Sequence, residues 1–249
     1  MQWSVEEISL VGDRDENQDR VLHWQQGDVT IGVVADGLGG HTGGALASAH
    51  FCEGLHATSA EFLPPVLAAN DDDLKAAAQA WVMAAAESMR SSIRAHSPTL
   101  SPLTTCAVVV LDAQSVLTLH VGDSRVYRLA SDGVQWRSRD HSVVQMLLDD
   151  GEITEAEMGT HPEQGRLLRA VGMEGDVRPA VRRHPALGEE EALLLCSDGF
   201  WEHVSQEEMC SLVSGGSPGL AAFAAQAVSR AAGKSDNVTA QLLRLRPGK

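Results

Sequence analysis

The chain has 249 residues, of which 43% are apolar, and this is enough for a single domain with a large buried core. Its formal charge of -15 at pH 7 argues against nucleic-acid binding as its main task, because such binding needs a basic surface. The first ten residues, MQWSVEEISL, lack the basic start and apolar core of a signal peptide, and no apolar stretch is long enough to cross a bilayer. We therefore predict a cytoplasmic protein that does not bind membranes.

The cysteines are far apart along the chain and form no CxxC motif or Cys/His cluster. Cys106 and Cys196 lie in apolar runs, where cysteine behaves as a small buried hydrophobic residue. The sequence therefore predicts neither a zinc site nor a disulfide framework, as is typical of a reducing compartment.

Runs rich in Val, Leu, Ile and Thr predict the strands. They are expected at 5–11, 28–35, 104–111, 115–122, 125–129, 192–197 and 238–245. The run SVLTLHVGDSRVYRLA predicts a hairpin whose connection is Gly122-Asp123-Ser124.

Two early helices are predicted from apolar stripes at helical spacing, one over 45–55 and one over 74–89. A late pair follows the strand at 192–197. Ser205 and Glu208 fit a capping box for the first of these, and Ser217-Pro218 is expected to start a second helix that stops at Gly233. Strands and helices do not alternate strictly, so we predict an α+β fold in which helices cover antiparallel sheets.

Residues 140–180 do not fit this scheme. They contain short helical pieces, at Val143–Leu148 and Glu155–Met158, among glycine, proline and charged residues. A long, weakly periodic insertion of this kind is either a lid or binding loop, or an irregular connection.

Two apolar runs each end in aspartate followed by glycine, at Asp36-Gly37 and Asp198-Gly199. With Asp123 in GDSR and Asp236 in SDN, they predict carboxylates gathered at one end of a sheet. Crowded carboxylates repel one another unless a cation neutralises them. Oxygen ligands without His or Cys favour Mg²⁺ or Mn²⁺ over zinc.

Each of these residues also has a structural interpretation. Asp-Gly is a common turn dipeptide, Asp123 could form an Asx-turn in its hairpin, and Asp236 could cap the last strand. Arg14 in GDRDENQDR could belong to a solvated run of charges, although an arginine beside a metal centre can also hold a phosphate through two hydrogen bonds.

Eight motifs in order resemble those of the metal-dependent serine/threonine phosphatases of the PP2C (PPM) family, and most of all its compact bacterial branch. They are GDRDENQDR, VADGLGGHTGG, LTTCAVVVL, HVGDSRVYRL, DHSVVQ, GRLLRAVG, LLLCSDGFWEHV and SDNVTAQLL. The resemblance runs from about residue 5 to residue 245. It implies a four-layer α-β-β-α sandwich with a central antiparallel β-sandwich and flanking helix pairs. It also implies a single phosphatase domain over 1–249 with a mobile flap at about 140–180.

The resemblance implies roles for individual residues. Asp36 matches the carboxylate that bridges two Mn²⁺ or Mg²⁺ ions, and Gly37 contributes its carbonyl. The arginine that binds substrate phosphate is matched by Arg14. The remaining metal-binding positions, the last of them for a third, weaker metal, are matched by Asp19, Asp198, Asp236 and Asp123.

The sequence departs from the family pattern at two positions. Leu38 stands where many eukaryotic members carry the histidine of DGHGG, which has been proposed as the general acid, and an apolar side chain cannot donate a proton. His41, three residues later, is either a substitute or a surface histidine, so the general acid stays unassigned. Gln18 stands where some relatives carry glutamate, and it adds no charge.

The resemblance implies hydrolysis of phosphoserine and phosphothreonine by water activated between two metal ions, without a phosphoenzyme. The expected partners are phosphorylated proteins, including a serine/threonine kinase and its substrates, and nothing requires more than a monomer. Two alternatives stay open. One is a catalytically weak relative that binds phosphoproteins as a regulator, although suitable residues fill every metal-binding position. The other is a metal-dependent hydrolase of nucleotides or nucleic acid, against which the negative charge argues.

Overall fold

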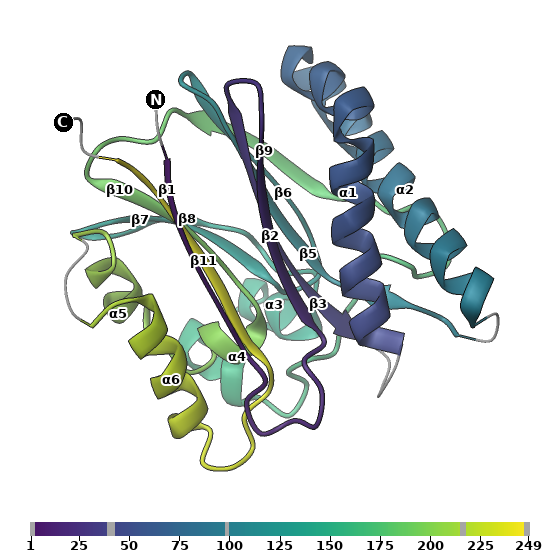
Figure 1. Ribbon diagram of the computed structural model, residues 1–249. Coiled ribbons are helices and arrows are strands. Elements are labelled where there is room, and N and C mark those ends of the chain that lie inside the picture. The colour runs from purple at the N-terminus through teal and green to yellow at the C-terminus, as the bar shows by residue number, and fades with distance from the viewer. Residues whose placement is uncertain (1–2, 39–42, 98–99, 215–217, 247–249) are drawn as a thin grey trace.

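Two antiparallel sheets pack face to face in the computed structural model, and helices cover the outer face of each sheet (Figure 1). The structure describes residues 3–38, 43–97, 100–214 and 218–246. This architecture confirms the predicted α+β fold with a central antiparallel β-sandwich and flanking helix pairs. No helix in the described ranges combines the length and apolarity that crossing a bilayer requires.

The first sheet has the strand order β1-β11-β10-β7-β8. Its strands are β1 (Trp3–Leu10), β11 (Val238–Leu245), β10 (Glu191–Cys196), β7 (Arg125–Ala130) and β8 (Gly133–Arg137). The second sheet has the order β2-β3-β5-β6-β9, with the short β4 paired to the end of β3. Its strands are β2 (Asp19–Gln26), β3 (Val29–Leu38), β4 (Leu103–Thr104), β5 (Cys106–Leu111), β6 (Ser115–Val121) and β9 (Ala180–Pro185).

Three apolar layers hold the sandwich together. The central layer, between the sheets, includes Val34, Val109 and Leu195. One outer layer packs the second sheet against α1 and α2, and the other packs the first sheet against α4, α5 and α6. Central strands such as β5, CAVVVL, are therefore buried along their whole length, because both faces meet apolar side chains.

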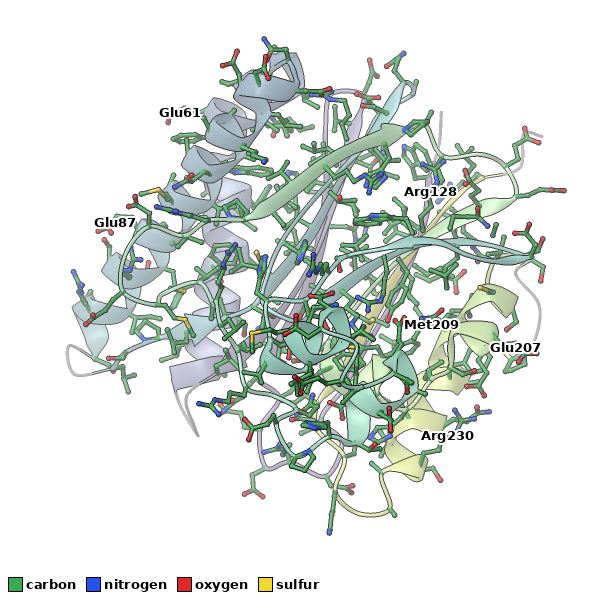
Figure 2. The ribbon with its side chains drawn as sticks, turned by 180° about the vertical axis from the view of Figure 1, so that it is seen from behind. Glu61, Glu87, Arg128, Glu207, Met209 and Arg230 are labelled. Carbon is green, nitrogen blue, oxygen red and sulfur yellow. The ribbon has the colours of Figure 1, made fainter. Side chains whose placement is uncertain are left out.

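The helices follow the predicted order. The early pair is α1 (Gly43–Ala68) and α2 (Asp71–His96), and the late group is α4 (Asp198–Trp201), α5 (Gln206–Ser211) and α6 (Leu220–Arg230). Figure 2 shows Glu61 and Glu87 on the early pair at one side of the molecule, with Glu207 and Arg230 on the late helices at the other.

The helix starts can be compared with the predicted ones. The capping box of Ser205 and Glu208 opens α5 as predicted. The second late helix starts later than predicted, at Leu220 with Gly219 as its N-cap, and Ser217 lies outside the described residues.

The predicted hairpin over SVLTLHVGDSRVYRLA is wrong, because its two strands belong to different sheets. β6 pairs with β5 and β9, whereas β7 pairs with β10 and β8. The sequence pattern could not separate the two cases, since both strands are mostly buried in either arrangement. Gly122 makes the crossover with φ +98, and a Cβ there would lie 2.6 Å from the Thr105 side chain. The crossover places Asp123 at the end of the sandwich, between the sheets.

The pattern missed β2, β8 and β9. All three lie at a sheet edge and carry polar residues among the apolar ones, so no unbroken apolar run marks them. In the 140–180 segment the structure places α3 (Val143–Asp149) and the 3₁₀-helix η1 (Glu155–Thr160), close to the predicted helical pieces.

Candidate metal centre

Asp19 and Asp36 face each other at one end of the β2–β3 pair. Asp19 is the first residue of β2, and Asp36 is its register partner near the end of β3. Directly opposed residues on antiparallel strands have Cβ atoms only about 5 Å apart, so the two carboxylates are held close by the backbone. The side chain of Asp19 is buried, while that of Asp36 is partly exposed to a cleft.

The sequence predicted that the strand ends at Asp36, but it does not. β3 continues to Leu38, because Gly37 and Leu38 pair with β4 after β5 has diverged. The backbone of Asp36 is held by two threonines of the LTT motif. Its N–H donates to Thr105 Oγ1 at 3.0 Å, and its carbonyl accepts from Thr104 Oγ1 at 2.8 Å.

Gly37 is needed at its position for a packing reason. A Cβ there would lie 2.0 Å from the carbonyl oxygen of Gly44, at the start of α1. Only a residue without a side chain lets the helix approach the strand this closely. Gly37 also lines the cleft beside Asp36.

Asp198 and Asp236 come from the other sheet. Ser197 is the N-cap of the short helix α4, and Asp198 is its first residue, so the second Asp-Gly pair begins a helix rather than a turn. One Asp198 oxygen accepts from the Gly199 N–H at 2.7 Å, and Asp236 holds the Asn237 N–H in the same way at 2.7 Å. Both aspartates line the cleft that contains Asp36.

The SDN motif is attached to the GDRDENQ loop through Asn237. Its amide nitrogen donates to the carbonyls of Val11 and Glu16, and its amide oxygen accepts from the Gln18 N–H at 2.8 Å. These bonds carry the loop to the edge of the cleft. Arg14 reaches the cleft by this route and pairs with Asp236 Oδ2 at 2.7 Å, in an exposed ion pair.

Asp123 lies next to this group but not on the cleft surface. It is buried, and its carbonyl accepts from Trp201 Nε1 at 3.0 Å. Burial is the largest cause that raises the pKa of Asp123, and the negative charge of Asp198 is the next, so the two carboxylates lie close together. The structure therefore brings all the predicted aspartates and Arg14 to one end of the sandwich.

Glu202 was not predicted from the sequence. It follows Asp198 by one helical turn of α4, a spacing that places two side chains on one helix face. Burial, with Asp198 and Asp123 next, raises the pKa of Glu202 to about 9. The i, i+4 spacing of the two acids in SDGFWE was the available signal.

Gln164 is a second residue that the sequence did not indicate. Its amide nitrogen donates to Glu202 Oε1 and, at 3.3 Å, to Asp198 Oδ2. It belongs to the 140–180 segment, and with Gly165 it forms one wall of the cleft. The position of that wall depends on tertiary contacts, which no local pattern reveals.

Among the described residues, Arg14 is the cation paired with this group, and it pairs only with the exposed Asp236, so the buried carboxylates repel one another. Burial raises the pKa of Asp36 well above its ordinary range, and the charges of Asp19 and Asp198 add to the effect. Burial likewise raises the pKa of Asp19 to about 7 and that of Asp198 to about 6, although hydrogen bonds from Ser197 and Gln164 partly oppose these shifts.

The residues fit a divalent cation by two observations. Asp19 Oδ2 accepts from Ser197 Oγ at 2.7 Å, but Oδ1 is buried and has no hydrogen-bond partner in the structure. A buried charged oxygen without a partner is costly, and a metal ion or its water would satisfy it. The donors are carboxylates and a carbonyl, which suit Mg²⁺ or Mn²⁺. Among the described residues, no three His, Cys, Asp or Glu side chains are already grouped as a ready-made ion site.

The departures from the family pattern can also be placed. Leu38 lines the cleft and supplies no proton there, and Gln18 lies beside it. His41 lies outside the described residues, so its predicted alternatives stay open.

Comparisons with known proteins show what the chain as a whole is similar to. The family model described as Protein phosphatase 2C matches residues 11–244. The serine/threonine phosphatase stp of Listeria innocua is 33% identical over 183 residues, which are 72% of this chain and 69% of that protein.

Solved structures extend the likeness to the whole chain. The serine/threonine phosphatase PstP/Ppp of Mycobacterium tuberculosis is 27% identical with a TM-score of 0.77, and the match covers 98% of this chain and 99% of that one. A catalytic domain of PstP in complex with 2 manganese ions is 26% identical with a TM-score of 0.75, over 97% of each chain.

Proposed function

The chain belongs to the protein phosphatase 2C family of metal-dependent serine/threonine phosphatases, and on this premise we propose that its carboxylate cleft is the site that removes phosphate from phosphoproteins. The protein is a serine/threonine protein phosphatase, a hydrolase of phosphate monoesters. The observation that supports the cleft as its active site is the unpartnered, buried Asp19 Oδ1 beside carboxylates of raised pKa.

The acidic residues in and beside the cleft have proposed roles toward two Mn²⁺ or Mg²⁺ ions. As the family resemblance implies, Asp36 would be a ligand of both ions, and acidic neighbours from both sheets lie close to it. Gly37 would offer its carbonyl, and Asp198, Asp236 and Asp19 would offer their carboxylates. Asp123 and Glu202 lie beyond Asp198 and would hold a third ion. When bound, the cations supply positive charge that polarises water and the phosphate ester.

Arg14 is proposed to position the phosphate. It is exposed at the edge of the cleft, and its guanidinium already pairs with an anionic oxygen, that of Asp236. A guanidinium donates two parallel hydrogen bonds to a phosphate, and this fixes the orientation of the ester. The leaving oxygen still needs a proton, which Leu38 cannot give. The general acid therefore stays unassigned.

The further proposals concern partners and location. We expect the substrates to include a serine/threonine kinase and its targets, with the protein acting as a monomer in the cytoplasm. The four cysteines are free and buried, in agreement with a reducing compartment. Two measurements test these points. One identifies the phosphoproteins that lose phosphate when the protein is overexpressed, and the other identifies the cell fraction that contains the protein.

The central experiment measures phosphate release from a phosphothreonine peptide with Mn²⁺ and with EDTA. The variants are Asp36→Ala and Asp198→Asn, and Mn²⁺ binding by titration calorimetry is a second measurement. Asp28→Asn is the matched control, because Asp28 is exposed in the turn at the opposite end of the β2–β3 pair.

We expect EDTA and both variants to lower the rate by at least about a thousandfold, as loss of a group that acts on the reacting atoms does. The control should keep its rate and its Mn²⁺ affinity. Equal phosphate release by all the proteins would remove the catalytic role of the cleft, and release by none would favour the regulatory alternative.

A further inference from the structure

A second cavity lies between the edge strands of the two sheets, outside the carboxylate cleft. Its volume is about 500 Å³, and β6, β8, β9 and α3 contribute to its walls. Figure 2, which views the molecule from behind, shows β9 passing in front with the helical turns of the 140–180 segment below it. None of the residues that the structure describes lines both this cavity and the carboxylate cleft.

The cavity is lined by more arginines than acids, although the protein is strongly acidic; the cavity's two aspartates, Asp140 and Asp149, pair with Arg125 and Arg139. Four of the 19 Lys and Arg residues line it, in a chain of net charge -15. Arg137 and Arg139 are neutralised by Glu155 and Asp149. Among the described residues Arg169 and Arg182 form no ion pair, although Arg182 lies 5.7 Å from the ring centroid of Trp136. The cavity therefore presents two unneutralised guanidinium groups.

An apolar surface adjoins these charges. The exposed large apolar side chains of the described residues are few, and two of them, Met146 at 47% and Leu168 at 53% exposure, line this cavity. An exposed apolar group beside a charged one suits a ligand that carries both kinds of group. A peptide with an acidic and an apolar side chain fits this description, whereas a free inorganic anion uses only the arginines.

The interior of the cavity is connected to the metal centre through His141. This ring stacks on His120 with centroids 4.8 Å apart. Burial lowers the pKa of His141 to about 3 and also lowers the pKa of His120, so both histidines contribute shape rather than charge. The ring Nδ1 of His141 accepts from the Gly122 N–H at 3.2 Å. The backbone N–H of His141 donates to the Gly122 carbonyl at 2.8 Å. Gly122 directly precedes Asp123. The cavity and the metal centre therefore lie on two sides of one turn.

We propose that this cavity binds a segment of the protein substrate that carries an acidic or phosphorylated side chain beside an apolar one. The inference rests on the proposed function and adds a determinant of substrate choice. A negative surface repels an acidic peptide except where the field is locally reversed, so the two free arginines would select where such a segment docks. The shared turn keeps the two sites within reach of one extended peptide, which spans about 3.3 Å per residue.

The experiment uses two phosphothreonine peptides that differ only outside the phosphorylated residue. One carries a Glu-Leu pair, placed in turn at increasing distances on either side, and the other carries Gln-Ser. The variant is Arg169→Gln/Arg182→Gln. The matched control is Arg94→Gln/Arg178→Gln, which removes the same charge from exposed arginines that do not line the cavity. Leu168→Ser tests the apolar part separately.

For the Glu-Leu peptide at its best spacing, we expect the KM of the double variant to rise about three- to tenfold, as the loss of two exposed charge pairs predicts. Leu168→Ser should raise it less. The control should behave as the unchanged protein. The Gln-Ser peptide should keep its kinetic constants in all variants. So should p-nitrophenyl phosphate, because an ester this small, when bound at the metal centre, does not extend into the cavity. Equal KM values for the Glu-Leu peptide in variant and control would overturn the proposal.

Direct binding separates this proposal from the proposed function. Asp36→Asn protein is titrated with the Glu-Leu peptide lacking its phosphate, and with inorganic phosphate. Peptide binding that the double substitution abolishes supports the docking site even if no protein in the series hydrolyses phosphate. Binding of inorganic phosphate alone, at the same arginines, would overturn it in favour of a small-anion site. Wild-type protein that fails to hydrolyse p-nitrophenyl phosphate with Mn²⁺ would instead contradict the proposed function.

Discussion

Asp140 and Asp123 are both buried near the β6–β7 crossover, but their surroundings are opposite. Asp140 is 5% exposed, and its oxygens accept hydrogen bonds from Arg125 at 3.0 and 2.7 Å. Asp123 is 4% exposed and lies among acids, so burial first, and then Asp198 and Asp140, raises its pKa well above the ordinary range.

The difference separates a structural carboxylate from one kept for a ligand. The chain supplies Asp140 with its own cation, and Arg125 is further held by Tyr127 and by the ring of Trp201, 3.5 Å away. It supplies no comparable cation to Asp36 or Asp19. Burying charges without a partner is unfavourable. The group that contains Asp36 and Asp19 is therefore stable only when a cation comes from solution or when protons stay bound.

The largest expected effect on stability comes from breaking the internal pair. Asp140→Ala leaves Arg125 buried without its counterion, and we expect it to lower the free energy of unfolding by about 3–5 kcal/mol. Urea denaturation measures the change. Asp149→Ala is the control, because its partner Arg139 is exposed, and such pairs contribute about 1 kcal/mol or less. Equal losses in the two variants would contradict the distinction between the buried pair and surface pairs.

Only part of the fold could be predicted from the sequence. The apolar runs indicated the central strands, and the stripes indicated both helix groups, because burial on one or both faces leaves a local pattern. The edge strands β2, β8 and β9 left none, since half of their surface is polar. The β6–β7 crossover was taken for a hairpin because strand partners are chosen by tertiary packing, which two similar apolar strands do not record.

The site was more predictable than the fold around it. Asp36, Asp198 and Asp236 could be grouped because each lies at one end of a recognisable apolar run, and the structure brings them together. Glu202 was missed although its spacing from Asp198 was visible. Gln164 could not be predicted, since the path of the 140–180 segment over the cleft depends on contacts with distant parts of the chain, such as the Thr104–Val171 bridge.

The metal centre should reveal its unneutralised acids through pH. In EDTA, the folded state keeps protons on Asp19 up to a pKa of about 7 and on Glu202 up to about 9, whereas the unfolded chain has released them above pH 5. The folded state therefore binds more protons between pH 6.5 and 8, and its stability falls as pH rises. One retained proton gives a loss on the order of 2 kcal/mol over this range.

Saturating Mn²⁺ and Glu202→Gln are the comparisons for this pH profile. The metal should flatten the profile, because it replaces protons as the counterion. Glu202→Gln should reduce the slope in EDTA. Stability that rises with pH in EDTA over the same range would show that these acids are neutralised within the chain.

Removing one of the repelling charges should stabilise the metal-free protein. Asp36→Asn keeps the size of the side chain and lowers the charge of the group, so we expect the free energy of unfolding in EDTA at pH 8 to rise by about 1 kcal/mol. The variant should gain less stability from Mn²⁺ than the unchanged protein, since a ligand stabilises only the state that binds it. Asp28→Asn should move neither value. A loss of stability in EDTA as large as that of Asp140→Ala would mean that Asp36 is itself structural.

The smallest effect on stability is expected at Arg14, whose pair with Asp236 is exposed, unlike that of Arg125. Arg14→Ala should change the free energy of unfolding by less than about 1 kcal/mol. It should raise the KM for a phosphothreonine peptide about tenfold while Mn²⁺ binding persists, because a phosphate-positioning group acts on substrate and not on the metal. Arg94→Ala removes the same charge from an exposed arginine outside the cleft and should leave KM unchanged. If Arg14→Ala instead abolished Mn²⁺ binding, the arginine would be orienting Asp236 for the metal. The exposed pair would then serve its carboxylate as Arg125 serves Asp140, and the separation between structural and ligand-binding acids would fail at this position.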